Sequence, residues 1–394
     1  MEQQRPHDKQ MNGMDAKKEY ATATVVSTAA NFIMERDEAF THTYRTYVRL
    51  REQGKIQLRF WFSNAVDSTW DKGAVAKGGQ FGGNWLIEAA FAADGGTGRD
   101  GSVSAPSRVS VTFGGSLTRL VRPGETFWSD PVEIDLPQNH DLAFTWTIAS
   151  GSGRSVPYNT EQMLVTAYDA QGKHADEAEG DSFVPSENLL VMPAWIGYKK
   201  QGTRQRMVFF GDSITQGVRT AKDGYQYWVA RIADGLGADY DIWNIGSGWA
   251  RAYDASGNGA WLNKAKQGDQ VLIALGVNDI DIGERSAEEL LGDLSTIVSL
   301  LKENNSAVDI ILFTVPPFNF TGDRESTWRL VNETLRTSPP AGVSRVFDIA
   351  AVLSQPAPEE HRLRPEYMSS EFDPHPNGLA GAAVSEAFLK WYLE

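Results

Sequence analysis

The sequence predicts two domains, an all-β sandwich of jelly-roll-like type followed by a three-layer α/β/α domain with a mostly parallel sheet. The chain of 394 residues exceeds the roughly 250–300 residues at which a single hydrophobic core usually stops growing. In much of the first half apolar residues alternate with polar ones, whereas in the second half short apolar runs alternate with helical segments. A composition of 41% hydrophobic and 22% charged residues is typical of a globular protein.

The alternation in the first half has the period of a β-strand. It is clearest in the segment KIQLRFWFS at 55–63, where apolar side chains occupy every second position from Ile56 to Phe62. Similar short segments follow at regular spacing, separated by turn-rich pieces such as DGGTGRDG and RPGE, and this spacing predicts a β-sandwich. These segments are SRVSVTF, DPVEIDL and DLAFTWTI. The polar, acidic stretch 170–185 is predicted to be a loop or the approach to a linker.

A change of pattern between Lys199 and Arg206 marks the predicted domain boundary. We therefore assign residues 1–200 to the β-sandwich and 201–394 to the α/β domain. Five βα units in the second part imply a mostly parallel sheet covered on both faces. Their strands are predicted in MVFF, DIWNI, QVLIAL, DIILFTV and SRVFDI. Ser286 and Glu289 form the pattern of a capping box at the start of an amphipathic helix.

Charge and composition exclude several classes of function. An excess of 51 acidic over 37 basic residues gives a net charge of -14, which disfavours nucleic acid and anionic membrane surfaces as partners. Cysteine is absent, so disulfides, thiolate metal sites and a cysteine nucleophile are excluded. The sequence contains no apolar run typical of a signal peptide or a membrane span, which predicts a cytoplasmic protein. The loop 94–101 lacks the spacing of an EF-hand, and we expect no metal and no cofactor.

Polar motifs follow the predicted strands of the second domain. MVFF leads directly into the motif GDSIT, which begins at Gly211 and contains Ser213. The next two strands lead into NIGSGW at 244–249 and GVND at 276–279, and DPHPNG at 373–378 precedes an apolar C-terminal helix. Because ligands of open parallel sheets bind at the carboxyl ends of the strands, we expect these motifs to share one site.

The residue types in these motifs are those that acyl transfer requires. A serine hydroxyl needs a base, a group that orients the base, and donors for the developing oxyanion. Ser213 lies where a strand turns into a helix, so its own N–H can point at a substrate oxygen. Of six histidines, only His361 and His375 lie in the second domain. His361 belongs to the charged run PEEHRLRPE and is predicted to be solvated, which leaves His375 as the base.

The four blocks, in this order, resemble those of the SGNH (GDSL) hydrolase family, over the region from Met207 to the C-terminus. The resemblance implies that Ser213 is the nucleophile and that Asp373 and His375 complete a triad. It also implies that Gly248 and Asn278 donate to the oxyanion beside the Ser213 amide. The N-terminal half is similar to the β-sandwich that precedes this domain in one bacterial branch of the family, through LRFWFSN, VTFGG and PGETFWSDPV.

Two positions depart from the family pattern. The family's acid usually lies three residues before the histidine, where this chain has Phe372, and the nearest carboxylates are Asp373 and Glu371. The family's glycine in the second block usually lies five residues after the asparagine, where this chain has Trp249. A one-residue deletion would bring Gly248 to that place, and Gly246 is the alternative.

The predicted function is a serine esterase that hydrolyses short-chain carboxylic esters through an acyl-enzyme. The substrate expected is a small-molecule or carbohydrate ester, with carbohydrate O-acetyl esters first. A lipase or thioesterase acting on longer acyl chains is the alternative, as is a carbohydrate-binding protein with an inert hydrolase domain. The motif G-x-S-x-G of α/β-hydrolases is absent. Trp249 and Trp261 are candidates for sugar stacking, and a homo-oligomer is possible.

Overall fold

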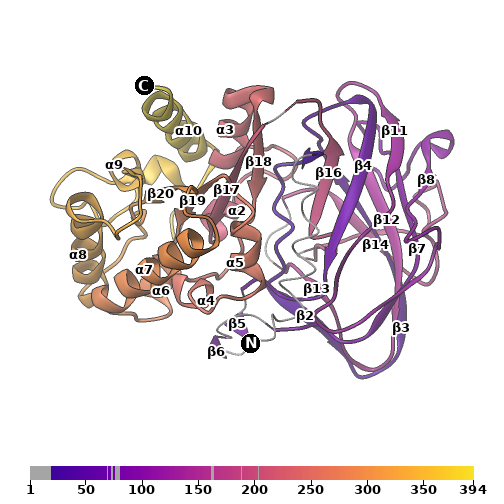
Figure 1. The fold of residues 1–394 in the computed structure, drawn as a ribbon, viewed down its shortest axis with the longest axis horizontal. Coiled ribbons are helices and arrows are strands. Elements are labelled where there is room, and N and C mark those ends of the chain that lie inside the picture. Colours follow the sequence, from indigo (N-terminus) through magenta and orange to yellow (C-terminus); the bar gives the residue numbers. More distant parts are fainter. Residues whose placement is uncertain are drawn as a thin grey trace. The chain divides into compact units, whose positions relative to one another are not determined.

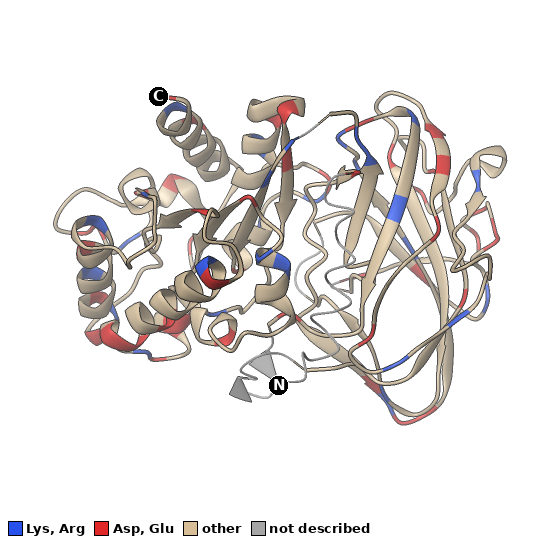
Figure 2. Cartoon of the chain, viewed as in Figure 1, with Lys and Arg blue, Asp and Glu red and all other residues tan. Residues whose placement is uncertain are grey.

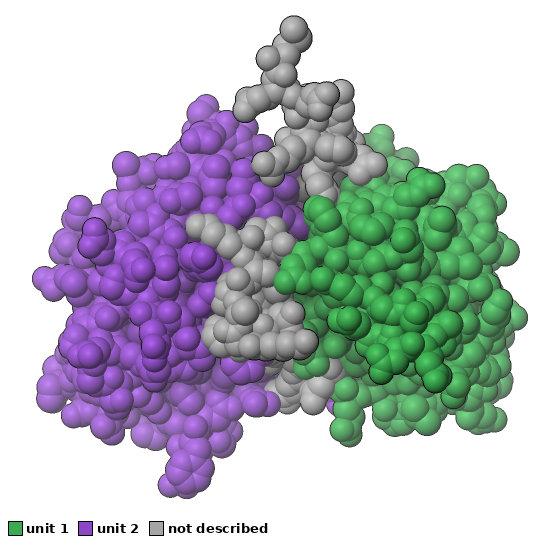
Figure 3. All heavy atoms as spheres, turned by 90° about the horizontal axis from the view of Figure 1, so that it is seen from below, with its two compact units in different colours: residues 1–66, 80–204 green, residues 67–79, 205–394 purple. Residues whose placement is uncertain are grey.

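A computed structural model of the protein describes residues 19–68, 70–71, 74–75, 80–160, 164–187, 189–202 and 204–394. The chain divides into two compact units (Figure 3). The first comprises Met1–Val66 and Gln80–Arg204, and the second comprises Asp67–Gly79 and Gln205–Glu394. The chain therefore enters the second unit twice, first with the short segment 67–79 and then with its C-terminal half.

The first unit is an antiparallel β-sandwich, as predicted (Figure 1). One sheet has the strand order β1-β16-β4-β10, with β11 also paired to β4. The other has the order β15-β14-β3-β12-β7-β8, with β9 also paired to β7. The rings of Phe60 on β4 and Phe144 on β12 lie 4.8 Å apart, so the two sheets pack face to face.

The strands of this unit are as follows. The first sheet contains β1 (Tyr20–Thr22), β4 (Gly54–Ser63), β10 (Thr126–Trp128), β11 (Val132–Leu136) and β16 (Trp195–Lys199). The second sheet contains β3 (Phe40–Val48), β7 (Trp85–Asp94), β8 (Val109–Ser110), β9 (Arg119–Val121), β12 (Leu142–Ser150), β14 (Ala167–Gln171) and β15 (Val184–Pro185). A separate ribbon pairs β2 (Phe32–Arg36) with β13 (Gly153–Tyr158).

Strand β4 shows where the alternating pattern holds and where it fails. Leu58, Phe60 and Phe62 are buried, as the period of two predicts. Trp61, on the opposite face, is also buried, so this end of the strand is covered on both sides. The segment SRVSVTF forms only the two-residue strand β8, because its pairing with β7 is limited to Phe91 and Ala92.

The second unit contains a five-stranded, fully parallel sheet with the order β18-β17-β19-β20-β21. Helices cover both faces, which confirms the predicted three layers (Figure 1). On β17, Phe209 packs against Trp228 on one face, and Phe210 packs against Trp261 on the other, with ring centroids 5.5 and 4.2 Å apart. The strands are β17 (Gln205–Gly211), β18 (Tyr240–Asn244), β19 (Gln270–Ala274), β20 (Asp309–Phe313) and β21 (Arg345–Phe347).

One helix start in this unit was marked in the sequence, by Ser286 and Glu289. The capping box is confirmed: the Ser286 hydroxyl accepts from the Glu289 amide, and the Glu289 carboxylate accepts from the Ser286 amide. The helices are α2 (Ser213–Gln216), α3 (Trp228–Leu236), α4 (Ala252–Ala255), α5 (Ala260–Ala265), α6 (Val277–Asp281), α7 (Ala287–Asn304), α8 (Asp323–Thr337), α9 (Ile349–Leu353) and α10 (Gly378–Leu393). No helix in the described part of the chain is long and apolar enough to cross a membrane.

Among the described residues of the segment 67–79, Asp67 and Ser68 make polar contacts with helices of the second unit. The Asp67 carboxylate lies 2.7 Å from the Lys264 ammonium, and both side chains are buried. The Ser68 hydroxyl donates to Asp254 Oδ2 at 2.9 Å. Asp254 lies on α4 and Lys264 on α5, so these contacts fasten both short helices. The short hairpin of β5 (Trp70–Asp71) and β6 (Ala74–Val75) follows them.

Candidate active site

Ser213 is the first residue of helix α2, at the end of strand β17, which lies between β18 and β19 in the sheet. Asp212 caps this helix, because its Oδ1 accepts from the Ile214 amide at 2.9 Å. Gly211 allows the close approach of the strand to the helix: a Cβ there would lie 2.0 Å from Thr215 Oγ1 and 2.7 Å from the Ala274 carbonyl oxygen. The Ser213 N–H makes no hydrogen bond to any residue that the structure describes, as is usual for the first amides of a helix.

Three of the predicted residues lie together in a continuous series of contacts. Ser213 Oγ lies 3.1 Å from His375 Nε2, and His375 Nδ1 lies 2.6 Å from Asp373 Oδ1. The His375 amide also donates to the same Asp373 oxygen, at 3.1 Å. Glu371, the other carboxylate considered from the sequence, is exposed, and no hydrogen bond or ion pair joins it to His375 among the described residues. The geometry therefore favours Asp373 over Glu371 as the partner of the imidazole.

His375 is held from three sides. It lies on β23 (Asp373–Pro376), which pairs with β22 (Met368–Ser370) in a small antiparallel hairpin. Immediately after it, Asn377 caps α10 by accepting from the Leu379 and Ala380 amides. The ring of Phe318 meets the imidazole edge to face, with centroids 5.1 Å apart. These contacts fix the imidazole between a strand, a helix cap and an aromatic side chain.

The protonation states suit a base paired with a carboxylate. Burial, the largest influence, lowers the pKa of His375 below its usual 6.5, and outweighs the opposite effect of Asp373. Burial raises the pKa of Asp373, but hydrogen bonds from His375 and Arg219 outweigh it and lower that pKa to about 2. Near neutral pH the imidazole is therefore neutral and the carboxylate ionised, so Nε2 can accept a proton from Ser213.

Asn278 lies on α6, directly after the neighbouring strand β19. Its Nδ2 donates to the Ala250 carbonyl at 3.0 Å. A side-chain amide carries two hydrogens, so a second donor remains. The loop that contains Ala250 is joined to the end of β17, because the Ser247 amide donates to the Gly211 carbonyl at 3.0 Å.

The two glycines considered as oxyanion donors both have protein acceptors. The Gly248 amide donates to Gln216 Oε1 at 2.8 Å, and the Gly246 amide donates to Asn244 Oδ1 at 2.9 Å. Gly246 has a steric role as well, since a Cβ there would lie 2.3 Å from the Gln216 amide nitrogen. As it stands, the structure does not offer the Gly248 amide to a substrate.

Trp249 occupies the position where the family pattern has its glycine. It adopts a left-handed backbone conformation, with φ of 65°, which is uncommon for a bulky residue. Its amide makes no hydrogen bond within the described chain, and its side chain is 42% exposed. A backbone donor and an aromatic surface therefore occur together at this residue.

Two buried aspartates hold the backbone of the site. Asp279 accepts from the Ala252 and Tyr253 amides, at 2.9 and 3.1 Å, and so fixes the start of α4. Burial raises the pKa of Asp279 to about 6 and that of Asp212 to about 7. Both carboxylates are engaged with backbone amides, which is the geometry of structural rather than reacting groups.

The expectation that His361 is solvated was wrong, and one of the two candidate stacking residues lies in the core. His361 is buried rather than solvated, with Nδ1 3.2 Å from Glu325 Oε1, because α8 and the loop after α9 enclose it. Trp261 is also buried, and its Nε1 donates to the Ile245 carbonyl at 2.8 Å, so it belongs to the core and cannot stack on a sugar. Of the two candidate stacking residues, Trp249 alone is exposed.

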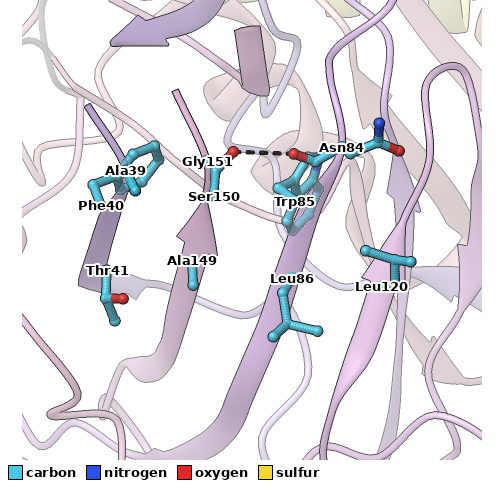
Figure 4. Close-up of a pocket in the computed structure, with 10 residues that line it drawn as sticks. All are labelled: Ala39, Phe40, Thr41, Asn84, Trp85, Leu86, Leu120, Ala149, Ser150 and Gly151. Carbon is cyan, nitrogen blue, oxygen red and sulfur yellow. Dashed lines mark hydrogen bonds between the residues drawn. The ribbon is translucent and has the colours of Figure 1, made fainter. Parts of the chain in front are cut away.

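Each unit contains a surface cavity. That of the β-sandwich, of about 470 Å³, is shown in Figure 4 and is lined by Ala39, Phe40, Thr41, Asn84, Trp85, Leu86, Leu120, Ala149, Ser150 and Gly151. That of the second unit, of about 420 Å³, is polar and lined by Ile280, Glu284, Arg285, Thr321, Asp323, Arg324 and Thr327. One of its lining residues, Ile280, lies two residues after Asn278 in the sequence. Helix α8 forms one wall of this cavity and carries charges of both signs (Figure 2). Within the described ranges, no group of three or more His, Asp or Glu residues could hold a metal ion.

Comparison with known proteins gives one family match and several distant structural ones. Residues 209–382 match the GDSL-like Lipase/Acylhydrolase family. A family two carbohydrate esterase from Cellvibrio japonicus is 11% identical, with 95% of this chain and 96% of that chain covered and a TM-score of 0.37. A carbohydrate esterase family 3 protein from Talaromyces cellulolyticus is 18% identical over 48% of this chain and 96% of that chain, with a TM-score of 0.37. The salicylyl-acyltransferase SsfX3 from a tetracycline biosynthetic pathway is 14% identical over 86% of this chain and 81% of that chain, with a TM-score of 0.38. No curated protein matches the chain.

Proposed function

Because the C-terminal half of the chain is a GDSL-like lipase/acylhydrolase domain, we propose that the protein is a serine esterase that hydrolyses short-chain carboxylic esters through an acyl-enzyme. The observation that carries this proposal is the series of contacts from Ser213 through His375 to Asp373. Such a series supplies a nucleophile, a base and a carboxylate that orients the base.

Each residue of the series has a defined task. Ser213 Oγ attacks the ester carbonyl carbon while His375 Nε2 accepts the hydroxyl proton, and Asp373 stabilises the resulting imidazolium. The tetrahedral intermediate then expels the alcohol, which takes the proton from Nε2, and the acyl group remains on Ser213. A water molecule attacks the acyl-enzyme in the same way, with His375 again accepting the proton. Release of the carboxylic acid restores the serine hydroxyl.

The oxyanion of the intermediate needs preorganised donors. The Ser213 amide and the second N–H of the Asn278 side chain are both without acceptors within the described chain. Trp249 contributes the third donor in this proposal, in place of Gly248, whose amide is bonded to Gln216. The hydrogen bond from Asn278 to Ala250 ties the side-chain donor to the loop that bears the backbone donor.

The alcohol part of the substrate is a hydroxyl-rich group such as a sugar, and the acyl part is acetyl. Trp249 supports this assignment, because an exposed aromatic ring beside the loop of the site can stack on the apolar face of a sugar ring. The polar cavity after Asn278 supports it as well, since charged groups and the hydroxyls of Thr321 and Thr327 suit hydrogen bonding to alcohols.

A second candidate is an esterase or thioesterase acting on longer acyl chains. It is favoured by two exposed apolar side chains beside the catalytic histidine segment, Phe372 at 88% and Leu379 at 64% exposure. Large exposed apolar groups near a site can bind an acyl chain.

Hydrolysis of nitrophenyl esters of increasing acyl length, together with acetylated xylose or glucose, separates these candidates. Acetyl esters should be hydrolysed fastest, and acetylated sugars should compete; a maximum at an acyl length of about eight carbons or more would instead support the second candidate. Ser213→Ala should lower kcat by about 10⁴ or more, whereas Ser306→Ala, at an exposed serine of the same unit, should not. Absence of hydrolysis and of sulfonyl fluoride labelling in the wild type would contradict the proposal and favour an inert domain.

A further inference from the structure

The carboxylate of Asp373 has a second partner besides His375. Its Oδ1 faces the histidine, whereas its Oδ2 accepts from Arg219 Nε at 2.7 Å. Resting on the proposed function, we propose that Arg219 is a positioning residue of the triad: its guanidinium holds one oxygen of Asp373 so that the other stays aligned with His375 Nδ1.

The short spacing between acid and base makes such a support necessary. Because Asp373 lies only two residues before His375, its Oδ1 accepts from both the amide and the imidazole of that residue, as in an Asx-turn. Pro374 and Pro376 keep the backbone of this segment extended, but they do not restrain the last torsion of the aspartate side chain, which is broad. A hydrogen bond to Oδ2 fixes the plane of the carboxylate.

The loop that carries Arg219 is built to present it. Gly217 follows the last residue of helix α2, and the Thr220 hydroxyl and amide both donate to the Gly217 carbonyl, at 2.7 and 3.2 Å. Within this turn Arg219 has a left-handed backbone, with φ of 73°. Non-glycine residues keep such a conformation where the surroundings impose it, often at functional sites. This loop directly follows the helix that begins with Ser213. Through Arg219 it therefore connects the nucleophile's helix to Asp373 independently of His375.

Arg219 also contributes to the electrostatic field at the base. The charged groups that act on His375 are Asp373, Arg219 and Asp281; the two carboxylates raise the pKa of the imidazole, and Arg219 lowers it. Phe318 and Ser213, which also contact the ring, carry no charge. Removing the guanidinium should therefore raise the pKa of His375 and shift the acid limb of the kcat/KM profile to higher pH.

Arg219→Met and Arg219→Lys test the proposal, with Arg336→Met as the matched control. Arg336 forms a similarly exposed pair with Asp348 in the same unit, at 2.8 Å. Arg219→Met should lower kcat by about tenfold to a hundredfold, as misaligned catalytic groups do, leave KM within about twofold, and shift the acid limb upward. In Arg219→Lys the acid limb of the kcat/KM profile should stay near its wild-type pH, because lysine retains the positive charge. Only part of kcat should be recovered, because lysine lacks the planar guanidinium with its fixed donors. The control should match the wild type in both respects.

A rise in KM with unchanged kcat would overturn the proposal, because Arg219 would then bind substrate. An acid limb that stays in place in Arg219→Met would also overturn it, whatever happens to kcat. Proton NMR titration of the His375 imidazole, assigned by its loss in His375→Gln, measures the same pKa without turnover. It therefore tests Arg219 even if no ester is hydrolysed, and an unchanged titration would refute the inference independently of the proposed function. Since Arg219 is 48% exposed, the variants should fold, and circular dichroism checks this.

Discussion

The ion pair between Asp67 and Lys264 should contribute strongly to the stability of the second unit. The perturbation that tests it is Asp67→Ala, which removes the carboxylate and leaves the ammonium of Lys264 in place. The two side chains are 0% and 2% exposed, and their charged atoms lie 2.7 Å apart. A charge at such depth cannot recover its hydration when its partner is lost.

The expected magnitude follows from this burial. Breaking a buried ion pair by removing one partner costs about 3–5 kcal/mol of unfolding free energy. For a unit of this size, that loss corresponds to a fall in melting temperature of roughly 6–20 °C. Replacing both residues, in Asp67→Leu/Lys264→Met, should restore most of the loss, because an apolar pair of similar volume needs no compensating charge.

Calorimetric unfolding of the wild type, the two single variants and the double variant provides the assay. Lys173→Met is the matched control, since Lys173 pairs with Glu88 at 2.7 Å but is 66% exposed, and it should cost less than about 1 kcal/mol. A loss below that value in Asp67→Ala, or a double variant as unstable as the single ones, would refute the reasoning. The pair would then be solvated in solution, or the segment 67–79 would not be bound to the second unit.

Further predictions concern the site. Asp373→Asn should lower kcat by about 10⁴, while Glu371→Gln changes it less than about twofold; the reverse order in folded variants would show that the carboxylate is misassigned. Asn278→Ala should lower kcat by about 10²–10³ with little change in KM, and a pure KM effect would contradict its role as a donor. Because burial lowers the pKa of His375, and the base must be neutral, the acid limb of the kcat/KM profile should have its midpoint below pH 6.5; a midpoint above 6.5 would contradict this. Gly246→Ala should disturb the turn after Ser213, because a Cβ would lie 2.3 Å from the Gln216 nitrogen, and unchanged activity and melting would show that the turn adapts.

The fold class was predictable because its signals are local. The apolar runs of the parallel strands and the capping box at Ser286 depend on residues close together in the sequence. Likewise, the place of Ser213 follows from a motif at a strand end, and that of His375 from a motif directly before the C-terminal helix. The prediction that His361 is solvated failed because residues of a charged run can be buried when they form ion pairs, here with Glu325. The choice of His375 as the base did not depend on that prediction alone.

What the sequence could not predict depends on long-range contacts. The partner of the Gly248 amide is a side chain 32 residues away, and nothing near the glycine indicates it. Arg219 could not be identified either, because it lies 154 residues from Asp373. The sequence did not decide between a stacking and a core role for Trp261; its contact with Phe210, 51 residues away in the sequence, places it in the core.

The second unit is discontinuous along the chain, and this has a consequence for its synthesis. Asp67 leaves the ribosome 197 residues before Lys264, an interval of roughly 10–40 s at ordinary translation rates. During that time the strands on either side, β4 and β7, can join the sandwich. Asp67 and Ser68, which lie between them, remain exposed to solvent until α4 and α5 have been synthesised. A gene fragment beginning at Gln205 would encode all five parallel strands but no Asp67 or Ser68. In such a fragment α4 and α5 should be less stable, because their contacts with Asp67 and Ser68 are missing. Adding the segment 67–79 as a separate peptide, or fusing it to the N-terminus of the fragment, should restore their stability.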